Sequence, residues 1–325
     1  MNMNKIIKAL VVALFVFSSS FAIESAKIPQ VLLWPKTPPG AKEGDAEKAE
    51  QRVATIKNGT HKAFRDNLRN IRVPAMDVYL PTKETQTGVA MVLFCGGAYR
   101  GVAIGAEGLL MQKFLNERGI AVFMVAYRCE PFNHPVPLWD AQRAMRIVRS
   151  RAREFGIDPN KIGAMGFSAG GHVVSTLSVH YDEAFDYTAM DEIDQVSARP
   201  DFTCLIYPLI SMRTELTHAV SRKLLLGGNP SEELIATLSN NEQVDKNTPP
   251  AFLAHGTADD VVHHENSLRY HEACRKKGVE TQLLLVKNGK HGPGKLDGKP
   301  SIRMASEEYV DSMLKWIEVT LKSPP

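Results

Sequence analysis

The sequence lacks any apolar run long enough to cross a bilayer. A spanning helix needs about 20 apolar residues, whereas the longest continuous apolar run of this 325-residue chain, Ala9–Phe17, has nine. Two lysines precede that run, and the small residues Ser20 and Ala22 follow it at the positions that a signal peptidase reads. We therefore predict a signal peptide over residues 1–22, no membrane span, and a secreted or periplasmic mature protein.

The sequence also has no large excess of positive or negative charge. The chain has 39 Lys and Arg residues against 36 Asp and Glu residues, and nucleic-acid binding requires Lys and Arg in clusters. One basic cluster, over 143–153, accompanies an apolar stripe at helical spacing, which is typical of a solvated helix face. We therefore expect no nucleic-acid partner.

Cysteine is scarce, and so are the patterns that bind metals. The four cysteines stand far apart, and three lie in or beside apolar runs, which is typical of buried free thiols rather than of a disulfide framework. The pair His263 and His264 follows Asp259 and Asp260 closely, but no third His or Cys stands at ligand spacing. We expect no metal and no cofactor, and the oligomeric state is left open by the sequence.

Short apolar runs alternate with amphipathic helical segments over most of the chain, without an internal repeat. This alternation predicts an α/β fold with a mostly parallel central sheet and helices on both faces. We expect an N-terminal arm over 23–66 and one domain over 67–325, in which an interruption over 212–248 is compatible with a small cap. Strands are expected near 76–80, 89–94, 120–127, 161–167, 202–207, 251–256 and 281–287, and helices near 109–118, 138–155, 169–179, 265–277 and 310–321.

The pentapeptide Gly166–Gly170, with the pattern G-x-S-x-G, directly follows an apolar strand and directly precedes a helical run. This is the required context of a nucleophile elbow, a strained strand-to-helix turn that exposes a serine hydroxyl at the edge of a sheet. The two outer glycines suit places where the strand and the helix approach each other closely. We therefore predict that Ser168 is a catalytic nucleophile.

A serine needs a base to take its proton, and the base needs a carboxylate to orient it. On this architecture the chain order is serine, acid, histidine. Asp259 and Asp260 follow the expected strand over 251–256, and His291 lies on a Gly-rich loop after the expected strand over 281–287. We predict Asp259 as the acid and His291 as the base, and we expect Asp260 to face solvent or to cap the next helix.

His291 lies late enough in the chain and on a loop just beyond a strand, and three other histidines are alternatives for the base. His255 lies within an expected strand, whereas His263 and His264 open the helix that follows the acid. Only a loop beyond a strand lets an imidazole reach the sheet edge, so His291 is favoured. The earlier His172 stands one helical turn after Ser168, where we expect a packing or hydrogen-bonding residue.

Acyl transfer also needs backbone N–H donors for the developing oxyanion. The residue after the nucleophile, Ala169, normally supplies one donor, and the loop after an earlier strand supplies the others. Gly97 and Ala98 follow the expected strand over 89–94 and are predicted to complete the oxyanion hole. Tyr99 is expected to line the substrate mouth, and for Glu107 a place at that mouth and a plain surface position are both open.

Two charged residues on the helix expected over 138–155, Asp140 and Arg143, stand one turn apart. They could be mistaken for catalytic groups. An acid near the start of a helix that pairs with a base on the same helix is the better interpretation, because both the helix dipole and the spacing favour it.

Six short segments occur in a specific order along the chain. They are Cys95–Tyr99, Asp140–Ala144, Gly166–His172, Arg199–Phe202, Pro249–Pro250 and His255–Asp260. Together they resemble exported bacterial α/β-hydrolases described as acetyl xylan esterases or xylan-associated esterases, from about Trp34 to the C-terminus. The resemblance implies the α/β-hydrolase fold and a carbohydrate-linked ester as substrate, with acetyl groups on a plant polysaccharide or its oligomers as the expected target.

The predicted oxyanion loop departs from the family's usual Pro-Gly-Gly-Gly-Tyr, because this chain has Cys95 and Ala98 in place of the proline and the third glycine. An alanine at a positive φ carries backbone strain that a glycine avoids. If the loop keeps the conformation that its glycines suit, we expect strain at Ala98.

Two further functions fit parts of the sequence. The turn around Asp259 also resembles that of prolyl-oligopeptidase-type serine peptidases, but those enzymes carry a large separate propeller domain for which this chain is too short. A non-catalytic binding protein could keep the same fold, but such proteins tend to lose triad residues, and all three predicted ones are present. A serine ester hydrolase is therefore the favoured function.

Overall fold

The structure is a computed structural model. The residues that it describes are 28–57, 64, 66–185, 187–188, 191–293 and 306–322. The predicted signal peptide over 1–22 lies outside the described residues. Within them, no helix combines the length and the apolar character needed to cross a bilayer.

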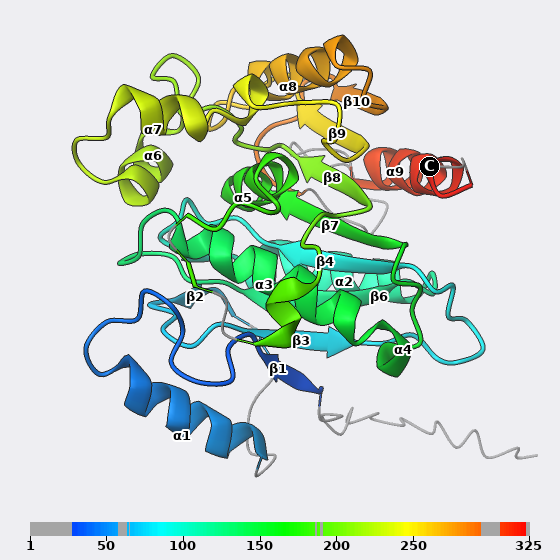
Figure 1. Ribbon diagram of the computed structural model, residues 1–325. Helices are drawn as coiled ribbons and strands as arrows, with labels where there is room; N and C mark the ends of the chain where they lie inside the picture. The colour runs from blue at the N-terminus through cyan, green and yellow to red at the C-terminus, as the bar shows by residue number, and fades with distance from the viewer. Residues whose placement is uncertain are drawn as a thin grey trace, which may run out of the picture.

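In the described part of the chain, one large sheet of eight strands runs through the centre of the molecule (Figure 1). Strand β3 pairs antiparallel with β1 and with β6, and all the other pairs are parallel. The expectation of a mostly parallel sheet is therefore confirmed. In spatial order the strands are β1 (Gln30–Leu32), β3 (Ala75–Tyr79), β6 (Ala121–Ala126), β4 (Ala90–Phe94), β7 (Ile162–Phe167), β8 (Phe202–Ile206), β9 (Ala251–Gly256) and β10 (Thr281–Val286).

Helices cover both faces of this sheet. The crossover from β4 to β6 moves toward the β1 edge of the sheet, whereas the crossovers from β6 to β7 and from β7 to β8 move toward the β10 edge. Because such crossovers are right-handed, α2 belongs on one face and α3 and α5 on the other, and Figure 1 shows α3 and α5 side by side in front of the sheet. The α-helices are α1 (Asp45–Lys57), α2 (Leu109–Asn116), α3 (Val136–Ser150), α4 (Ala152–Phe155), α5 (Ala169–Val179), α6 (Ala219–Leu226), α7 (Glu232–Thr237), α8 (Glu265–Lys276) and α9 (Ser306–Thr320).

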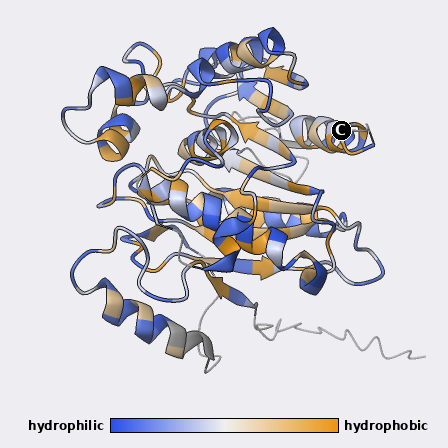
Figure 2. Ribbon diagram, in the orientation of Figure 1, coloured by the Kyte–Doolittle hydropathy of each residue, from blue (hydrophilic) through white to orange (hydrophobic). Residues whose placement is uncertain are grey.

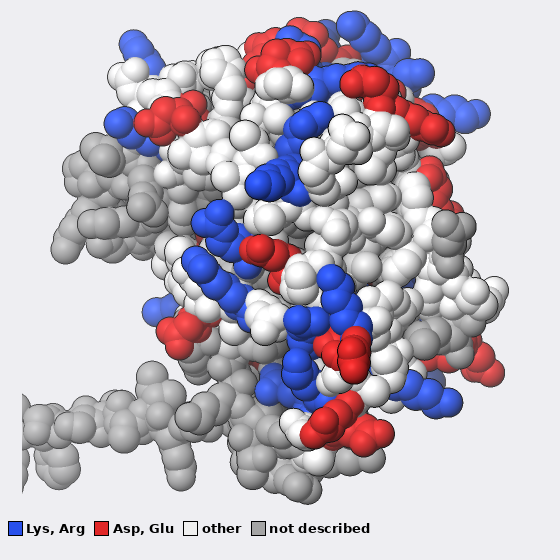
Figure 3. All heavy atoms as spheres, turned by 90° about the vertical axis from the view of Figure 1, so that its left-hand side faces the viewer, with Lys and Arg blue, Asp and Glu red and all other residues white. Residues whose placement is uncertain are grey.

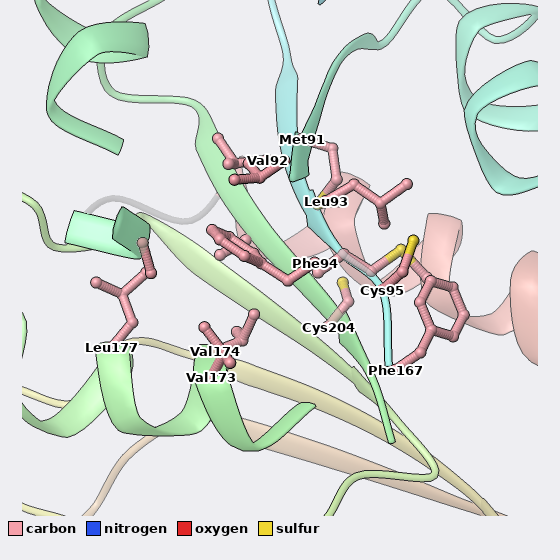
Figure 4. Packing of buried hydrophobic residues seen from close by; sticks show 14 of the residues in the cluster. Met91, Val92, Leu93, Phe94, Cys95, Phe167, Val173, Val174, Leu177 and Cys204 are labelled. Atoms are coloured by element: carbon pink, nitrogen blue, oxygen red, sulfur yellow. The ribbon is translucent and has the colours of Figure 1, made fainter. Parts of the chain in front are cut away.

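The core lies where the sheet meets these helices. Every residue of β4 and of β7 is buried, as a central parallel strand covered on both faces requires, and apolar residues concentrate in the sheet (Figure 2). Figure 4 shows Val92 and Phe94 of β4 on the side of the strand that faces Val173, Val174 and Leu177 of α5. Each such buried side chain contributes about 1.5–3 kcal/mol to stability. The four cysteines are free and buried, as the sequence predicts.

The stretch expected as an N-terminal arm is in part built into the domain. Strand β1 extends the sheet by pairing with β3, and Leu33 and Trp34 are buried in the core. Helix α1 follows, and further along, β2 (Leu68–Arg69) pairs with β5 (Gly101–Val102) in a small second sheet. The three residues of β1 are too few for an alternating pattern to stand out, so the sequence did not reveal this strand.

The interruption over 212–248 contains two short helices, α6 and α7, and a 3₁₀ turn, η3 (Asn240–Glu242). These helices lie together beyond one end of the strands (Figure 1). The Nδ2 group of Asn240 donates to Ser175 Oγ on α5 at 2.7 Å, and His172 Nε2 on α5 lies 2.8 Å from the carbonyl oxygen of Leu238. This segment is therefore joined to the helix that carries the elbow by buried hydrogen bonds.

The expected ion pair between Asp140 and Arg143 within α3 is wrong, because each residue has a partner elsewhere. Asp140 accepts hydrogen bonds from Arg128 Nε at 2.9 Å and from Trp34 Nε1 at 2.8 Å. Arg143 instead bonds to Asp191 and Asp194 and to the carbonyl oxygen of Leu33. Both side chains point into the interior, where long-range partners replace the neighbour one turn away, and they tie the N-terminal strand to α3.

The pair of Asp140 and Arg128 generates a stability prediction, because both side chains are fully buried. Asp140→Asn removes the charge that balances the Arg128 guanidinium, so we expect the free energy of unfolding to fall by about 3 kcal/mol, measured by urea denaturation. The control Asp158→Asn, in an exposed pair with Lys161 at 3.6 Å, should cost at most ~1 kcal/mol. Equal losses in the two variants would contradict this account of the core.

Candidate active site

Ser168 occupies the sharp turn between β7 and α5. Its φ of 51° and ψ of −119° are values that a non-glycine residue adopts only when its surroundings impose them. A Cβ on Gly170 would lie 2.1 Å from the carbonyl oxygen of Phe94, and one on Gly166 would lie 2.3 Å from that of Gly170. Both flanking positions therefore require glycine, which is the physical reason for the G-x-S-x-G pattern.

The structure brings together the three residues that the sequence predicted as nucleophile, base and acid. His291 Nε2 lies 3.0 Å from Ser168 Oγ, and His291 Nδ1 lies 2.7 Å from Asp259 Oδ2. The Asp259 side chain is fully buried, whereas that of His291 is 19% exposed. This chain of hydrogen bonds has the geometry that lets an imidazole remove a serine proton while a carboxylate holds the other ring nitrogen.

The carboxylate of Asp259 is held in its ionised form by its surroundings. Its Oδ1 accepts hydrogen bonds from the N–H groups of Val261 and Val262, each at 2.9 Å, and His255 Nε2 lies 3.3 Å from Oδ2. Burial alone raises the pKa of Asp259, but the bonds from His255, His291 and Val262 outweigh it and hold this pKa well below its usual range. Asp259 therefore stays charged wherever the protein is folded near neutral pH.

The neighbouring Asp260 is exposed and turns away from this cluster. Helix α8 begins without a side-chain cap, so of the two expected roles for Asp260, facing solvent fits and capping the helix does not. Adjacent residues of a tight turn direct their side chains differently, which explains why one aspartate reaches His291 and the other does not.

In the described part of the chain, the histidine within hydrogen-bond distance of Ser168 Oγ is His291 and not one of the three alternatives. His255 is fully buried, with Nδ1 2.8 Å from Ser267 Oγ and Nε2 2.9 Å from the carbonyl oxygen of Val262. The rings of His263 and His264 stack on each other with centroids 4.5 Å apart. In the described part of the chain, no group of three His, Cys, Asp or Glu side chains has the arrangement of a metal site.

The predicted oxyanion loop follows β4 and passes directly beside the elbow. Gly97, Ala98 and Tyr99 have φ values of 131°, 58° and 58°, so the expected strain at Ala98 is present and extends to Tyr99. Within the described residues, the N–H groups of Gly97 and Ala98 make no hydrogen bond. Ala169 opens α5, where an N–H group has no acceptor within the helix. All three N–H groups are therefore available as donors.

Tyr99 does not lie where the sequence analysis expected it. Its side chain is 1% exposed, and its hydroxyl group bonds to His172 Nδ1 at 2.8 Å. The positive φ of Tyr99 turns the side chain inward, away from a substrate mouth. His172 has the hydrogen-bonding role expected for it, and burial lowers its pKa to about 4, so this interior pair is neutral under ordinary conditions.

Glu107 is neither at the surface nor in an open mouth. It lies on the single-turn π-helix η1 (Ile104–Gly108), is 7% exposed, and accepts a hydrogen bond from the Gly96 N–H at 2.5 Å. Burial raises the pKa of this carboxyl to about 7, against the hydrogen bonds from Gly96 and Tyr207 and the attraction of His291. Neither expected placement of Glu107 included burial, although the sequence carries a sign of it, because this acid stands alone in the otherwise apolar stretch Ala103–Met111.

Charges of both signs intermingle on the face of the molecule that carries α6 and α7. Figure 3 shows this face, with Lys and Arg side chains in a broken vertical band and Asp and Glu side chains among them. A mixed band of this kind differs from the clustered basic surface of a nucleic-acid-binding protein.

Among proteins of known sequence, the relatives of this chain include an esterase and a xylanase. The chain is 34% identical to an acetylxylan esterase from Xylanibacter ruminicola, over 74% of this chain and 48% of that protein. It is 35% identical to endo-1,4-beta-xylanase B from Butyrivibrio fibrisolvens, over 68% of this chain and 34% of that protein. The match thus spans a third to a half of the length of these two relatives.

Solved structures share the same fold. An acetyl ester-xyloside bifunctional hydrolase from Caldicellulosiruptor lactoaceticus is 38% identical, with a TM-score of 0.68 over 76% of this chain and 88% of that chain. A truncated carbohydrate esterase from gut microbiota is 22% identical, with a TM-score of 0.65 over 81% and 98% of the two chains, and supports the fold alone. The family model BD-FAE matches residues 76–274. This chain therefore belongs to the BD-FAE family of α/β hydrolases.

Proposed function

We propose that this protein is a serine carboxylic-ester hydrolase that works through an acyl-enzyme. The observation that carries the proposal is the hydrogen-bonded chain from Ser168 through His291 to Asp259, built on a nucleophile elbow. The acetylxylan esterase and the acetyl ester-xyloside hydrolase among the relatives support an ester as the substrate.

In the acylation step, Ser168 Oγ attacks the ester carbonyl carbon while His291 Nε2 takes the hydroxyl proton. Asp259 accepts the hydrogen bond from His291 Nδ1, fixes the tautomer, and stabilises the imidazolium that forms. The oxyanion of the tetrahedral intermediate is stabilised by the N–H groups of Gly97, Ala98 and Ala169. The imidazolium then protonates the departing alcohol, which leaves an acyl group on Ser168.

Deacylation repeats the same proton transfers with water. His291 takes a proton from a water molecule, which attacks the acyl carbonyl, and the second tetrahedral intermediate uses the same oxyanion donors. When this intermediate collapses, His291 returns the proton to Ser168 Oγ and the carboxylic acid departs. The cycle needs no metal or cofactor, because the protein's own groups supply every proton and dipole.

We propose acetyl groups on a plant polysaccharide or its oligomers as the substrate. Support comes from the acetylxylan esterase and the acetyl ester-xyloside hydrolase among the relatives and from the ordered motifs of the sequence. We also propose that the protein is exported to the periplasm or the medium, which the N-terminal pattern of lysines, apolar run and small residues supports. Export would bring the enzyme to a polymer that cannot enter a cell.

Of the predictions that concern catalysis, the first tests the nucleophile. Ser168→Ala removes the attacking oxygen without adding bulk to the elbow, so turnover of nitrophenyl acetate and acetylated xylan should fall by ~10⁴-fold or more while the fold is kept. Initial rates and circular dichroism check this. Retention of a tenth of the wild-type rate by a folded variant would rule out Ser168 as the nucleophile.

The second prediction concerns the acyl group. The sequence has no long apolar lid of the kind that a lipase uses at a lipid surface, so kcat/KM should be highest for acetyl esters and fall toward decanoyl esters. A series of nitrophenyl esters measures this preference, with a prolyl peptide substrate included as the test of a peptidase. A steady rise of kcat/KM from acetyl to decanoyl would refute the proposed acyl class.

The third prediction separates two adjacent acids. Asp259→Asn removes the carboxylate that orients and stabilises His291, so kcat should fall by ~10³ to 10⁴ with little change in KM. Asp260→Asn is the matched control, since its side chain is exposed, and should keep kcat near the wild-type value. If Asp260→Asn were inactive and Asp259→Asn active, the acid would have been placed one residue too early.

A further inference from the structure

A second carboxyl group lies under the same site without a part in the proposed proton transfers. Glu107 contacts the oxyanion loop, because its Oε2 accepts a hydrogen bond from the Gly96 N–H at 2.5 Å. A Cβ on Gly96 would lie 2.8 Å from Ser168 Cβ and 3.3 Å from Glu107 Oε1. Glu107 is thus separated from the nucleophile by a single backbone segment that has no side chain.

The other oxygen of Glu107 connects to the base. Glu107 Oε1 accepts a hydrogen bond from the Tyr207 hydroxyl at 3.1 Å. Tyr207 follows β8, is fully buried, and is held by its own N–H, which donates to the carbonyl oxygen of Ala254 at 2.7 Å. Its ring packs edge-to-face on His291, with centroids 4.8 Å apart at 66°. One carboxyl therefore contacts the loop beside the oxyanion and the ring that packs against the imidazole.

A buried carboxylate is costly unless hydrogen bonds and nearby charge compensate it. For Glu107 the compensating groups are the Gly96 N–H, the Tyr207 hydroxyl and the positive charge that His291 carries in the middle of each step. Since the attraction between two charges is mutual, the same carboxylate stabilises the imidazolium form of His291. A leucine or methionine would fill this place without the free-energy cost of burying a charge, so the carboxylate of Glu107 requires an explanation.

We propose that Glu107 is a positioning residue of the ester hydrolase, which fixes the oxyanion loop through Gly96, supports the His291 ring through Tyr207, and stabilises the imidazolium by its charge. This inference rests on the proposed function. It gives the site two carboxylates with different tasks, because Asp259 bonds His291 directly whereas Glu107 acts through the loop and through Tyr207.

The charge state of Glu107 links this proposal to pH. The titratable groups that face it are His291, Tyr207, Tyr127, Tyr309 and Cys95. Burial raises the pKa of the three tyrosines and of the Cys95 thiol above their usual values, so these four stay neutral near pH 7. Because the pKa of Glu107 is about 7, its ionised form is lost as the pH falls below neutrality, and the rate should fall with it.

Two variants test the proposal with opposite expected shifts. Glu107→Gln keeps the shape but removes the charge and its titration, so kcat should fall about tenfold with KM unchanged, and the acid limb of the kcat profile should move to lower pH. Tyr207→Phe keeps the ring on His291 but removes a donor that lowers the pKa of Glu107, so the acid limb should move to higher pH.

Asp77→Asn is the matched control. Asp77 lies on β3, is also fully buried, accepts hydrogen bonds from the Phe64 N–H and from Gln30 Nε2, and has a pKa raised by burial. It has no contact with the elbow, so its loss should change stability while leaving kcat and the pH profile as in the wild type. Labelling with a fluorophosphonate counts the competent sites in each preparation, so kcat is expressed per site.

The outcomes separate the two proposals. Wild-type protein without turnover or label would contradict the proposed function itself. If the wild type is active, two results would overturn the role of Glu107. One is an equal kcat per site in Glu107→Gln and Asp77→Asn, and the other is an acid limb of the pH profile that does not shift in Glu107→Gln. If Glu107→Gln did not fold, Tyr207→Phe alone would decide, because an acid limb that stays in place or moves to lower pH overturns the proposal.

Discussion

The backbone turn at Ser168 is the constraint on which the rest of the site depends. A positive φ at a serine is costly in free energy, and two backbone hydrogen bonds hold the turn here. The Ser168 N–H donates to the carbonyl oxygen of Ile206, and the Leu209 N–H donates to the carbonyl oxygen of Ser168. Both partners belong to β8 and the segment after it. The position of the hydroxyl is therefore set by a neighbouring strand, and not by the pentapeptide alone.

Parallel strands explain how distant parts of the chain converge on this turn. The carboxyl ends of β4, β7, β9 and β10 lie at one edge of the sheet, so the loops that follow them carry the proposed oxyanion donors, nucleophile, acid and base. Strands β4, β7 and β9 are fully buried, and β10 is partly exposed apart from its buried last residue, Val286. The rigidity that catalysis requires thus comes from the core, whose apolar packing fixes the strand ends relative to one another.

Local and ordered features were predictable from the sequence, whereas buried polar partnerships were not. The elbow, the order of Ser168, Asp259 and His291, and the alternation of strands and helices leave patterns over a few residues. The partners of Asp140 and the inward turn of Tyr99 depend on contacts between segments far apart in the chain, and spacing along a helix cannot reveal them. The burial of Glu107 was not predicted, because it depends on a π-helical turn, η1, that shows no periodicity in the sequence.

The proposed mechanism requires that an acyl group is carried on Ser168 between the two halves of the reaction. Rapid mixing with nitrophenyl acetate, an acid quench within the first turnover, and mass spectrometry of the digested protein test it most directly. The account predicts a burst of nitrophenol and a single acetyl group on the peptide that contains Ser168. An acetyl group on another peptide would contradict this mechanism. So would turnover without any acetylated protein, if the Ser168→Ala variant also stayed active.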